Sequence, residues 1–169
     1  MRIISGKFRG KKLIKFNKEG IKPTTDKMRE SIFNIVISYL KINEKNNNLF
    51  FEKFNVLDIF AGTGALGLEA ISRGAENVTF IEKSRDNLRV LYKNIDHLKV
   101  SEKVKIIKRS IRKVKKIDGQ FDLIFMDPPY QMDLIIKKTL KKILDFKIIK
   151  KKNGDCNRIC KKEKNSYSK

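Results

Sequence analysis

The fold is decided by the stretch Val56-Leu57-Asp58-Ile59-Phe60-Ala61-Gly62-Thr63-Gly64-Ala65-Leu66-Gly67. An apolar run leads into three glycines with the spacing G-x-G-x-x-G, and a helical pattern follows them. Glycine lets the backbone turn sharply and lets a ligand approach the main chain closely. The stretch therefore predicts a strand, a tight ligand-binding loop and a helix.

The glycine spacing alone suits NAD as well as S-adenosylmethionine, and Asp58 distinguishes the two. S-adenosylmethionine has no phosphates and carries an ammonium and a sulfonium, which a carboxylate beside the loop attracts. The same carboxylate would repel the pyrophosphate of a dinucleotide. We therefore expect S-adenosylmethionine as the cofactor, with binding residues Asp58, Phe60, Gly62 and Gly64.

Outward from this stretch, short apolar runs alternate with helical segments. The runs cover residues 54–60, 77–81, 104–108 and 121–126, and the helical segments cover 65–73, 84–98 and a short piece near 110–116. This alternation predicts an α/β fold with a mostly parallel, Rossmann-like sheet and helices on both faces. Ligands of such sheets bind at the carboxyl ends of the strands, so functional residues are expected directly after each run.

Glu82 ends the second run, twenty residues after Gly62. A carboxylate at this position can accept hydrogen bonds from both ribose hydroxyls of an adenosine moiety, in NAD and S-adenosylmethionine sites alike. The alternative is an ordinary glutamate at an exposed strand end. We expect Glu82 to bind the cofactor.

The most specific motif, directly after the last run, is Asp127-Pro128-Pro129-Tyr130. Two prolines fix the backbone where Asp127 and nearby carbonyls can accept hydrogen bonds from an amino group, and Tyr130 can stack on a base. The amino nitrogen of a base is a poor nucleophile, so such acceptors direct its lone pair at the methyl group, and Asp127 can take the surplus proton. The motif predicts methyl transfer to an exocyclic amine of a nucleic-acid base; the alternative is a proline-rich loop that only caps a strand.

The charge of the chain favours a polyanionic partner. Across 169 residues, 40 Lys and Arg oppose 19 Asp and Glu, a formal net charge of +21. A bias towards lysine from AT-rich coding is the alternative source of this excess. Nine of the cations lie within residues 1–27, which favours RNA binding through phosphate contacts. The expected RNA-binding residues are Arg2, Lys7, Arg9, Lys11, Lys12, Lys27 and Arg29.

The pattern before residue 54 predicts a separate extension. Residues 2–10 suit a short hairpin, Thr24, Thr25 and Asp26 are N-cap candidates for a helix with apolar positions up to Tyr39, and residues 41–53 are interpreted as a linker. The predicted domains are a basic N-terminal extension (1–45), a cofactor-binding catalytic domain (54–150) and a disordered or aberrant tail (151–169).

Several classes of protein are not indicated. No apolar run approaches the roughly 18 residues that span a bilayer, and the start lacks a signal peptide, so we expect a cytoplasmic protein without a membrane partner. Cys156, Cys160 and His97 provide neither a disulfide framework nor a metal site. We expect no metal and a monomer.

The chain resembles the RsmD-type 16S rRNA (guanine-N2)-methyltransferases. The resemblance rests on residues 2–10, on Pro23 to Asn34, on the Asp58 to Gly67 loop and on Asp127 to Tyr130. It implies a class I methyltransferase fold, S-adenosylmethionine as cofactor, and the N2 amine of a guanine in 16S rRNA or the small ribosomal subunit as target. Arg109-Ser110 stands where this family often has an acidic or amide residue for the adenine of the cofactor, which is a departure from the family pattern, and Ser110 is the cofactor-binding residue expected there.

Two other functions stay open at this point. One is another amino-methyltransferase, such as an adenine-N6 enzyme, because Asp127 to Tyr130 suits either target. The other is a decayed homologue that binds RNA without catalysis.

The end of the chain is the feature that favours the second alternative, a decayed homologue. After a helix expected over 134–149, the fold needs a fifth strand, but residues 155–160 are polar. If these residues are encoded by AT-rich codons, a one-base shift gives Ile-Val-Ile-Glu-Tyr-Val, which is a typical buried strand. We expect a frameshifted, truncated product that is unstable or prone to aggregation.

Overall fold

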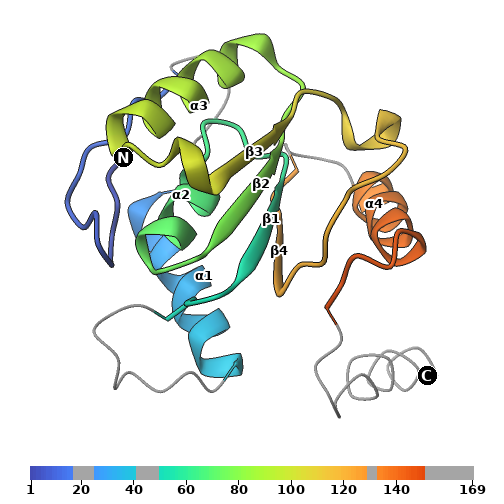
Figure 1. The fold of residues 1–169 in the computed structure, drawn as a ribbon, viewed down its shortest axis with the longest axis horizontal. Helices are drawn as coiled ribbons and strands as arrows, with labels where there is room; N and C mark the ends of the chain where they lie inside the picture. Colours follow the sequence, from blue (N-terminus) through green and yellow to red (C-terminus); the bar gives the residue numbers. More distant parts are fainter. Residues whose placement is uncertain (17–24, 41–49, 129–132, 151–169) are drawn as a thin grey trace.

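The computed structural model describes residues 1–16, 25–40, 50–128 and 133–150. Four strands form one parallel sheet in the order β3-β2-β1-β4 (Figure 1). The strands are β1 (Asn55–Ile59), β2 (Asn77–Ile81), β3 (Val104–Ile107) and β4 (Leu123–Met126), and the α-helices are α1 (Asp26–Tyr39), α2 (Ala65–Ser72), α3 (Arg85–Leu98) and α4 (Asp133–Asp145). Two 3-10 turns, η1 (Ser101–Lys103) and η2 (Ile111–Lys113), flank β3.

The register of the sheet brings the predicted site residues to one edge. Ile59 at the end of β1 lies opposite Ile81 of β2 and Met126 of β4. Glu82 and Asp127 are the residues that come directly after these two neighbouring strands. Both therefore belong to the same carboxyl edge, which is where the sequence pattern predicted the site.

The predicted α/β class and the predicted alternation of strands and helices are confirmed. The four apolar runs contain the four strands, which are shorter by one or two residues where they differ, because the apolar pattern extends beyond the paired residues. The last helix ends at Asp145 instead of residue 149, and Lys147 takes a left-handed backbone conformation with φ 52°. Ile148 and Lys150 then exchange main-chain hydrogen bonds with Phe121, so the chain starts to pair beside β4. The predicted tail, 151–169, lies outside the described residues.

Two apolar layers cover the sheet, one on each face. Strand residues that alternate along β1 to β4 separate into these layers, as a period of two requires. Val56, Val78 and Phe125 pack with α2, α3 and Phe33 of α1, whereas Leu57, Ile59 and Ile81 pack with η2 and α4. Figure 1 shows α4 on the far side of the sheet from α2 and α3. Helices on both faces, as predicted, are confirmed.

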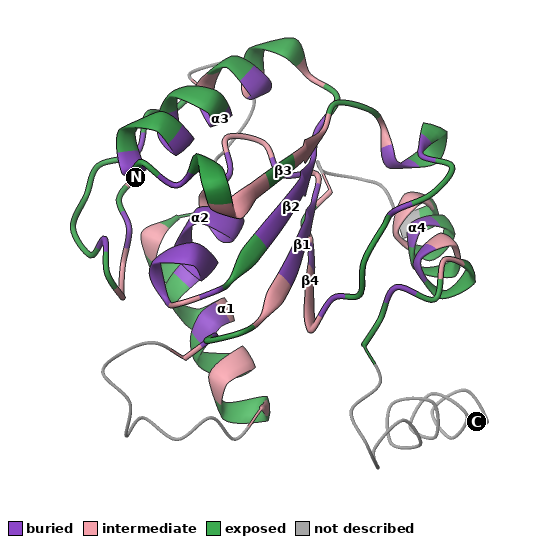
Figure 2. Cartoon of the chain, in the orientation of Figure 1, coloured by how far each residue is buried: buried purple, intermediate pink, exposed green. Residues whose placement is uncertain are grey.

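The N-terminal segment, residues 1–16, packs against this domain. Its expected hairpin is reduced to one antiparallel bridge between Arg2 and Lys12. Ile3, Phe8 and Leu13 are buried in the same apolar layer as α2 and α3, while most of the residues around them are exposed (Figure 2). The segment is therefore a docked part of the fold with one buried and one exposed side.

Gly6 allows the closest approach of this segment to α2. A Cβ on Gly6 would lie 1.9 Å from the carbonyl oxygen of Ser72, and its φ of 81° is left-handed. The Lys7 N–H donates to that oxygen at 2.7 Å. Only glycine fits this contact.

Helix α1 begins as expected, because the Thr25 hydroxyl accepts a hydrogen bond from the Met28 N–H. The interpretation of residues 41–53 as a linker is wrong for the part that the structure describes. Phe51 is buried and its ring packs edge-on against Phe33, with 5.8 Å between centroids. No helix in the described ranges is long and apolar enough to cross a membrane.

Candidate active site

Three carboxylates occupy the carboxyl edge of the sheet. Asp58 lies within β1, Glu82 directly follows β2 and Asp127 directly follows β4. Asp58 and Glu82 are buried, and Asp127 is exposed. In a chain with a net charge of +21, this concentration of acidic groups makes the edge locally favourable for a cationic ligand.

The glycine loop between β1 and α2 turns through left-handed backbone conformations. Phe60, Gly62 and Gly64 have φ values of 66°, 57° and 87°. The turn is held against β2, since the N–H groups of Phe60 and Ala61 both donate to the carbonyl of Ile81, at 3.1 and 3.2 Å. A Cβ on Gly62 would meet no heavy atom within 4 Å, so the main chain here borders open space.

The other two glycines serve packing. A Cβ on Gly64 would lie 2.4 Å from Leu91 Cδ1, and one on Gly67 would lie 2.3 Å from the Phe80 ring. The absence of a side chain at Gly67 lets helix α2 lie close to β2, and its absence at Gly64 makes room for Leu91 of α3. The three glycines of the motif thus divide into one that faces open space and two that permit close packing.

Asp58 fastens the start of α2 to the sheet. Its Oδ2 accepts a hydrogen bond from the Gly67 N–H at 2.9 Å. Burial raises the pKa of Asp58 from 3.8 to about 7; the Gly67 hydrogen bond opposes this, and the negative charges of Asp127 and Glu82 add to it. Near neutral pH, Asp58 is therefore poised between its neutral and ionised forms.

This raised pKa predicts a pH dependence of stability. Between pH 4 and 7 the folded state keeps the Asp58 proton, whereas the unfolded state releases it. The stability that proton binding by Asp58 adds to the folded state is therefore fully present below about pH 4 and is lost as the pH rises through about 7. Asp58→Asn keeps an acceptor for Gly67 but cannot ionise. The unfolding free energy of the ligand-free wild type should therefore fall relative to that of the variant from pH 5 to pH 8, as measured by urea denaturation. Parallel pH profiles for the two proteins would contradict the assignment.

Glu82 holds the loop from the neighbouring strand. One oxygen accepts from the Gly62 N–H at 2.8 Å, and the other accepts from the N–H groups of Lys83 and Ser84, both at 2.7 Å. These bonds fix both carboxylate oxygens, one of them against the main chain of Gly62. A carboxylate oxygen can accept more than one hydrogen bond, so a ligand hydroxyl can still donate to it.

Of the remaining predicted site residues, the structure describes Pro128 and Ser110. Pro128 follows Asp127 and is half-buried, whereas Pro129 and Tyr130 lie outside the described residues. Ser110 precedes η2 after the end of β3, and its side chain makes no capping hydrogen bond. Among the described residues of the Asp127 to Tyr130 motif, Asp127 is exposed, and it lies at the same edge of the sheet as the glycine loop.

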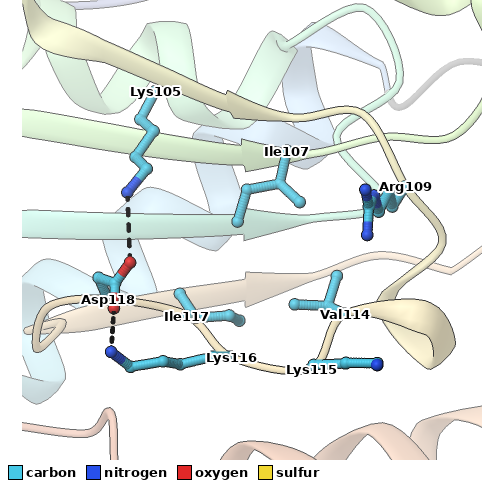
Figure 3. Close-up of a pocket in the computed structure, with 8 residues that line it drawn as sticks. All are labelled: Lys105, Ile107, Arg109, Val114, Lys115, Lys116, Ile117 and Asp118. Carbon is cyan, nitrogen blue, oxygen red and sulfur yellow. Dashed lines mark ion pairs between the residues drawn. The ribbon is translucent and has the colours of Figure 1, made fainter.

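A cavity of about 290 Å³ lies over one face of the sheet, between β3 and residues 114–118 (Figure 3). Ile107, Val114 and Ile117 supply its apolar lining, and Asp118 at its rim pairs with Lys116 at 2.8 Å. None of the predicted cofactor residues lines it. In the parts of the chain that the structure describes, no three His, Cys, Asp or Glu side chains form a group that could hold a metal ion.

Most of the predicted RNA-binding residues are exposed. They are Arg2, Lys7, Arg9, Lys11, Lys12 and Lys27. The expectation for Arg29 is corrected, because its side chain is 0% exposed and cannot reach a phosphate in this fold. Its Nη2 donates to the Arg2 carbonyl at 2.7 Å and to Asp26 at 2.6 Å.

Two buried polar residues that sequence reasoning missed anchor the N-terminal segment. Glu69 of α2 accepts from the N–H groups of Ile4 and Ser5, at 2.8 and 3.0 Å, and pairs with Arg73 at 2.8 Å. Asn94 of α3 binds the main chain of Ile14. The sequence did contain a signal for both residues. Glu69 interrupts the apolar run 65–71, and Asn94 lies on the same helical face as Leu88, Leu91 and Ile95. A polar residue at such a buried position indicates a hydrogen-bonding partner inside the fold.

Residues 1–166 match the family described as conserved hypothetical protein 95, which is the RsmD family. The chain belongs to the RsmD family. It is 38% identical over 138 residues to ribosomal RNA small subunit methyltransferase D of Haemophilus influenzae, covering 79% of this chain and 66% of the relative. It is 36% identical over 150 residues to the protein of the same name from Buchnera aphidicola subsp. Acyrthosiphon pisum, covering 88% and 72%.

Solved structures agree with this family assignment. A putative methyltransferase, yhhF, from Escherichia coli matches with a TM-score of 0.72 and 29% identity, covering 89% of this chain and 75% of the other. The more distant coclaurine N-methyltransferase, at 17% identity and a TM-score of 0.55, shares the fold. The class I methyltransferase fold is therefore shown, and the chain spans about two thirds of the length of the first curated relatives that it matches.

Proposed function

We propose that this protein transfers a methyl group from S-adenosylmethionine to the exocyclic N2 amine of a guanine in 16S rRNA. The observation that carries the proposal is the row of carboxylates at one edge of the sheet, in which exposed Asp127 shares the edge with the glycine loop held by Glu82. The family relatives named as rRNA small subunit methyltransferases support RNA as the substrate class.

The residues at this edge fit S-adenosylmethionine. The open side of Gly62 leaves room for a ligand against the main chain, and Glu82, which accepts from the Gly62 N–H, can still accept from a ribose hydroxyl. The negative charge of the edge suits the ammonium and the sulfonium. When bound, the cofactor would supply an electrophilic methyl group, whose bond to sulfur breaks, and would leave as S-adenosylhomocysteine.

A bound cation also favours the ionised form of Asp58, whose pKa is about 7 without a ligand. Affinity for S-adenosylmethionine should accordingly fall as the pH drops below 7. Isothermal titration at pH 6 and pH 8 tests this, and Asp58→Asn should flatten the dependence.

The role of Asp127 follows from the chemistry of an aromatic amine. A guanine N2 shares its lone pair with the ring and is a weak nucleophile. The Asp127 carboxylate accepts a hydrogen bond from one N–H and so turns the lone pair towards the methyl group. As the nitrogen–carbon bond forms, the amine becomes more acidic, and Asp127 receives the surplus proton. Pro128 restricts the main chain that presents this carboxylate.

RNA binding is assigned to the exposed side of the N-terminal segment. Lys7, Lys11 and Lys12 lie on that side and precede every cofactor residue in the chain. Cations that contact phosphates release counterions, so each contact adds close to one unit to the salt dependence of binding.

Replacing Lys7, Lys11 and Lys12 with Ala together should weaken binding to a 16S rRNA transcript and lower the slope of log K against log salt by about 2 to 3. The matched control replaces Lys137, Lys138 and Lys141, three exposed lysines of α4 on the other face of the sheet. Filter binding across a salt series measures both slopes. Equal slopes for the two triple variants would show that the excess charge acts without a defined site.

A second candidate function is methylation of adenine N6. Asp127 and Pro128 suit that amine equally, because both targets are amino groups on a planar base. Analysis of the methylated nucleoside distinguishes the two.

A further inference from the structure

Asn94 connects the N-terminal segment, to which RNA binding is assigned, with the glycine loop, to which cofactor binding is assigned. Its side chain is 0% exposed and lies on α3 between the N-terminal segment and the glycine loop. The Oδ1 accepts from the Ile14 N–H at 2.8 Å, and the Nδ2 donates to the Ile14 carbonyl at 3.1 Å. The same Nδ2 donates to the Thr63 carbonyl at 3.0 Å.

These three bonds use both donors of the amide and its carbonyl oxygen. Thr63 lies between Gly62 and Gly64, so its carbonyl belongs to the turn that the cofactor is proposed to contact. If Ile14 leaves its place, the amide loses a donor and an acceptor partner in a buried setting, where unpaired polar groups are costly. The orientation of the amide towards Thr63 therefore depends on the docking of the N-terminal segment.

The segment is well suited to transmit such a change. Leu13, beside Ile14, is buried in the layer that contains Leu91 of α3, and Glu69 fastens Ile4 and Ser5 at the other end. The exposed side of the same segment carries Lys7, Lys11 and Lys12. Docking buries Phe8, and Lys7 and Lys11 lie over its ring, with Nζ 5.7 and 5.2 Å from the centroid. The docked segment therefore holds these cations together, and a polyanion that contacts both binds the docked position more tightly than an undocked one.

We propose that Asn94 is a positioning residue that couples the docking of the N-terminal segment to the shape of the glycine loop, so that RNA bound to the segment raises the affinity for the cofactor. The coupling rests on the proposed function for its ligands, but its structural core, the link from Ile14 to Thr63, does not. By linkage, a bound cofactor strengthens RNA binding by the same factor.

The first experiment needs no ligand. Amide hydrogen exchange of residues 61–65 is measured in the wild type, in Leu13→Ala, in Asn94→Ala and in the double variant. Leu13→Ala truncates a buried side chain of the segment at a position outside the loop, and it should increase exchange in the loop. In the Asn94→Ala background the same change should add little, because the connection is already broken. Lys93→Ala, an exposed neighbour on α3, is the control and should leave exchange in the loop unchanged.

The second experiment uses S-adenosylhomocysteine, titrated by calorimetry with and without a saturating 16S rRNA transcript. The transcript should tighten binding on the order of tenfold in the wild type, and the effect should vanish in Asn94→Ala. Circular dichroism establishes that each variant is folded.

Exchange effects that simply add in the double variant would overturn the coupling even if the protein is a methyltransferase. A transcript effect that persists in folded Asn94→Ala would overturn it too. Failure to bind S-adenosylhomocysteine in every variant, with non-additive exchange retained, would instead count against the proposed cofactor and leave the structural coupling supported.

Discussion

Asp127→Asn should lower the rate of methyl transfer by roughly 10² to 10³, the size of effect typical when one preorganised hydrogen-bonding group or general base is removed from an active site. The change keeps the size of the side chain but removes its charge and its capacity to take the proton. Affinity for S-adenosylhomocysteine should change little, since Glu82 and the glycine loop are intact. Single-turnover kinetics and calorimetry separate the two effects.

The matched control for this variant is Asp118→Asn. Asp118 is another exposed carboxylate that follows the β3 region, and it pairs with Lys116 and Lys105 away from the carboxyl edge. This variant should keep wild-type turnover. Near-native turnover in Asp127→Asn would remove Asp127 from the catalytic role.

Glu69→Ala should destabilise the fold by about 3 to 5 kcal/mol, the range expected when one partner of a buried ion pair is removed. Glu69 is fully buried with Arg73, and Arg29 Nη1 lies 3.7 Å from its Oε2. The variant would leave two buried guanidinium groups without this carboxylate and would free the N–H groups of Ile4 and Ser5. Urea denaturation measures the loss.

Glu76→Ala provides the comparison, because Glu76 is exposed and should cost well under 1 kcal/mol. Glu69→Gln keeps the shape and one acceptor, so its stability should fall between the two. A loss below about 1 kcal/mol for Glu69→Ala would mean that the buried charges are solvated by a rearranged N-terminal segment.

The sheet and its carboxyl edge were predictable because they follow from local pattern. Each apolar run had the length of a buried strand, and the residues after each run must share an edge in a parallel sheet. For this reason Asp58, Glu82 and Asp127 could be placed together before any coordinates were known.

What could not be predicted depends on contacts between distant segments. Arg29 had the charge of an RNA-binding residue, but the Arg2 carbonyl and Asp26 hold it inside the fold. Phe51 sat in a polar stretch without periodicity, and only its contact with Phe33 identifies it as core. The sequence around Asn94 does not identify its partners, because Ile14 and Thr63 lie 80 and 31 residues away along the chain.

The central claim is tested most directly by incubating the protein with S-adenosylmethionine carrying a labelled methyl group and small ribosomal subunits that lack the modification. The 16S rRNA is then digested to nucleosides and analysed by mass spectrometry. The account predicts label in N2-methylguanosine, formed roughly 10² to 10³ times more slowly when Asp127→Asn replaces the wild type. Label in N6-methyladenosine, or no labelled nucleoside from a folded protein that binds S-adenosylhomocysteine, would contradict it.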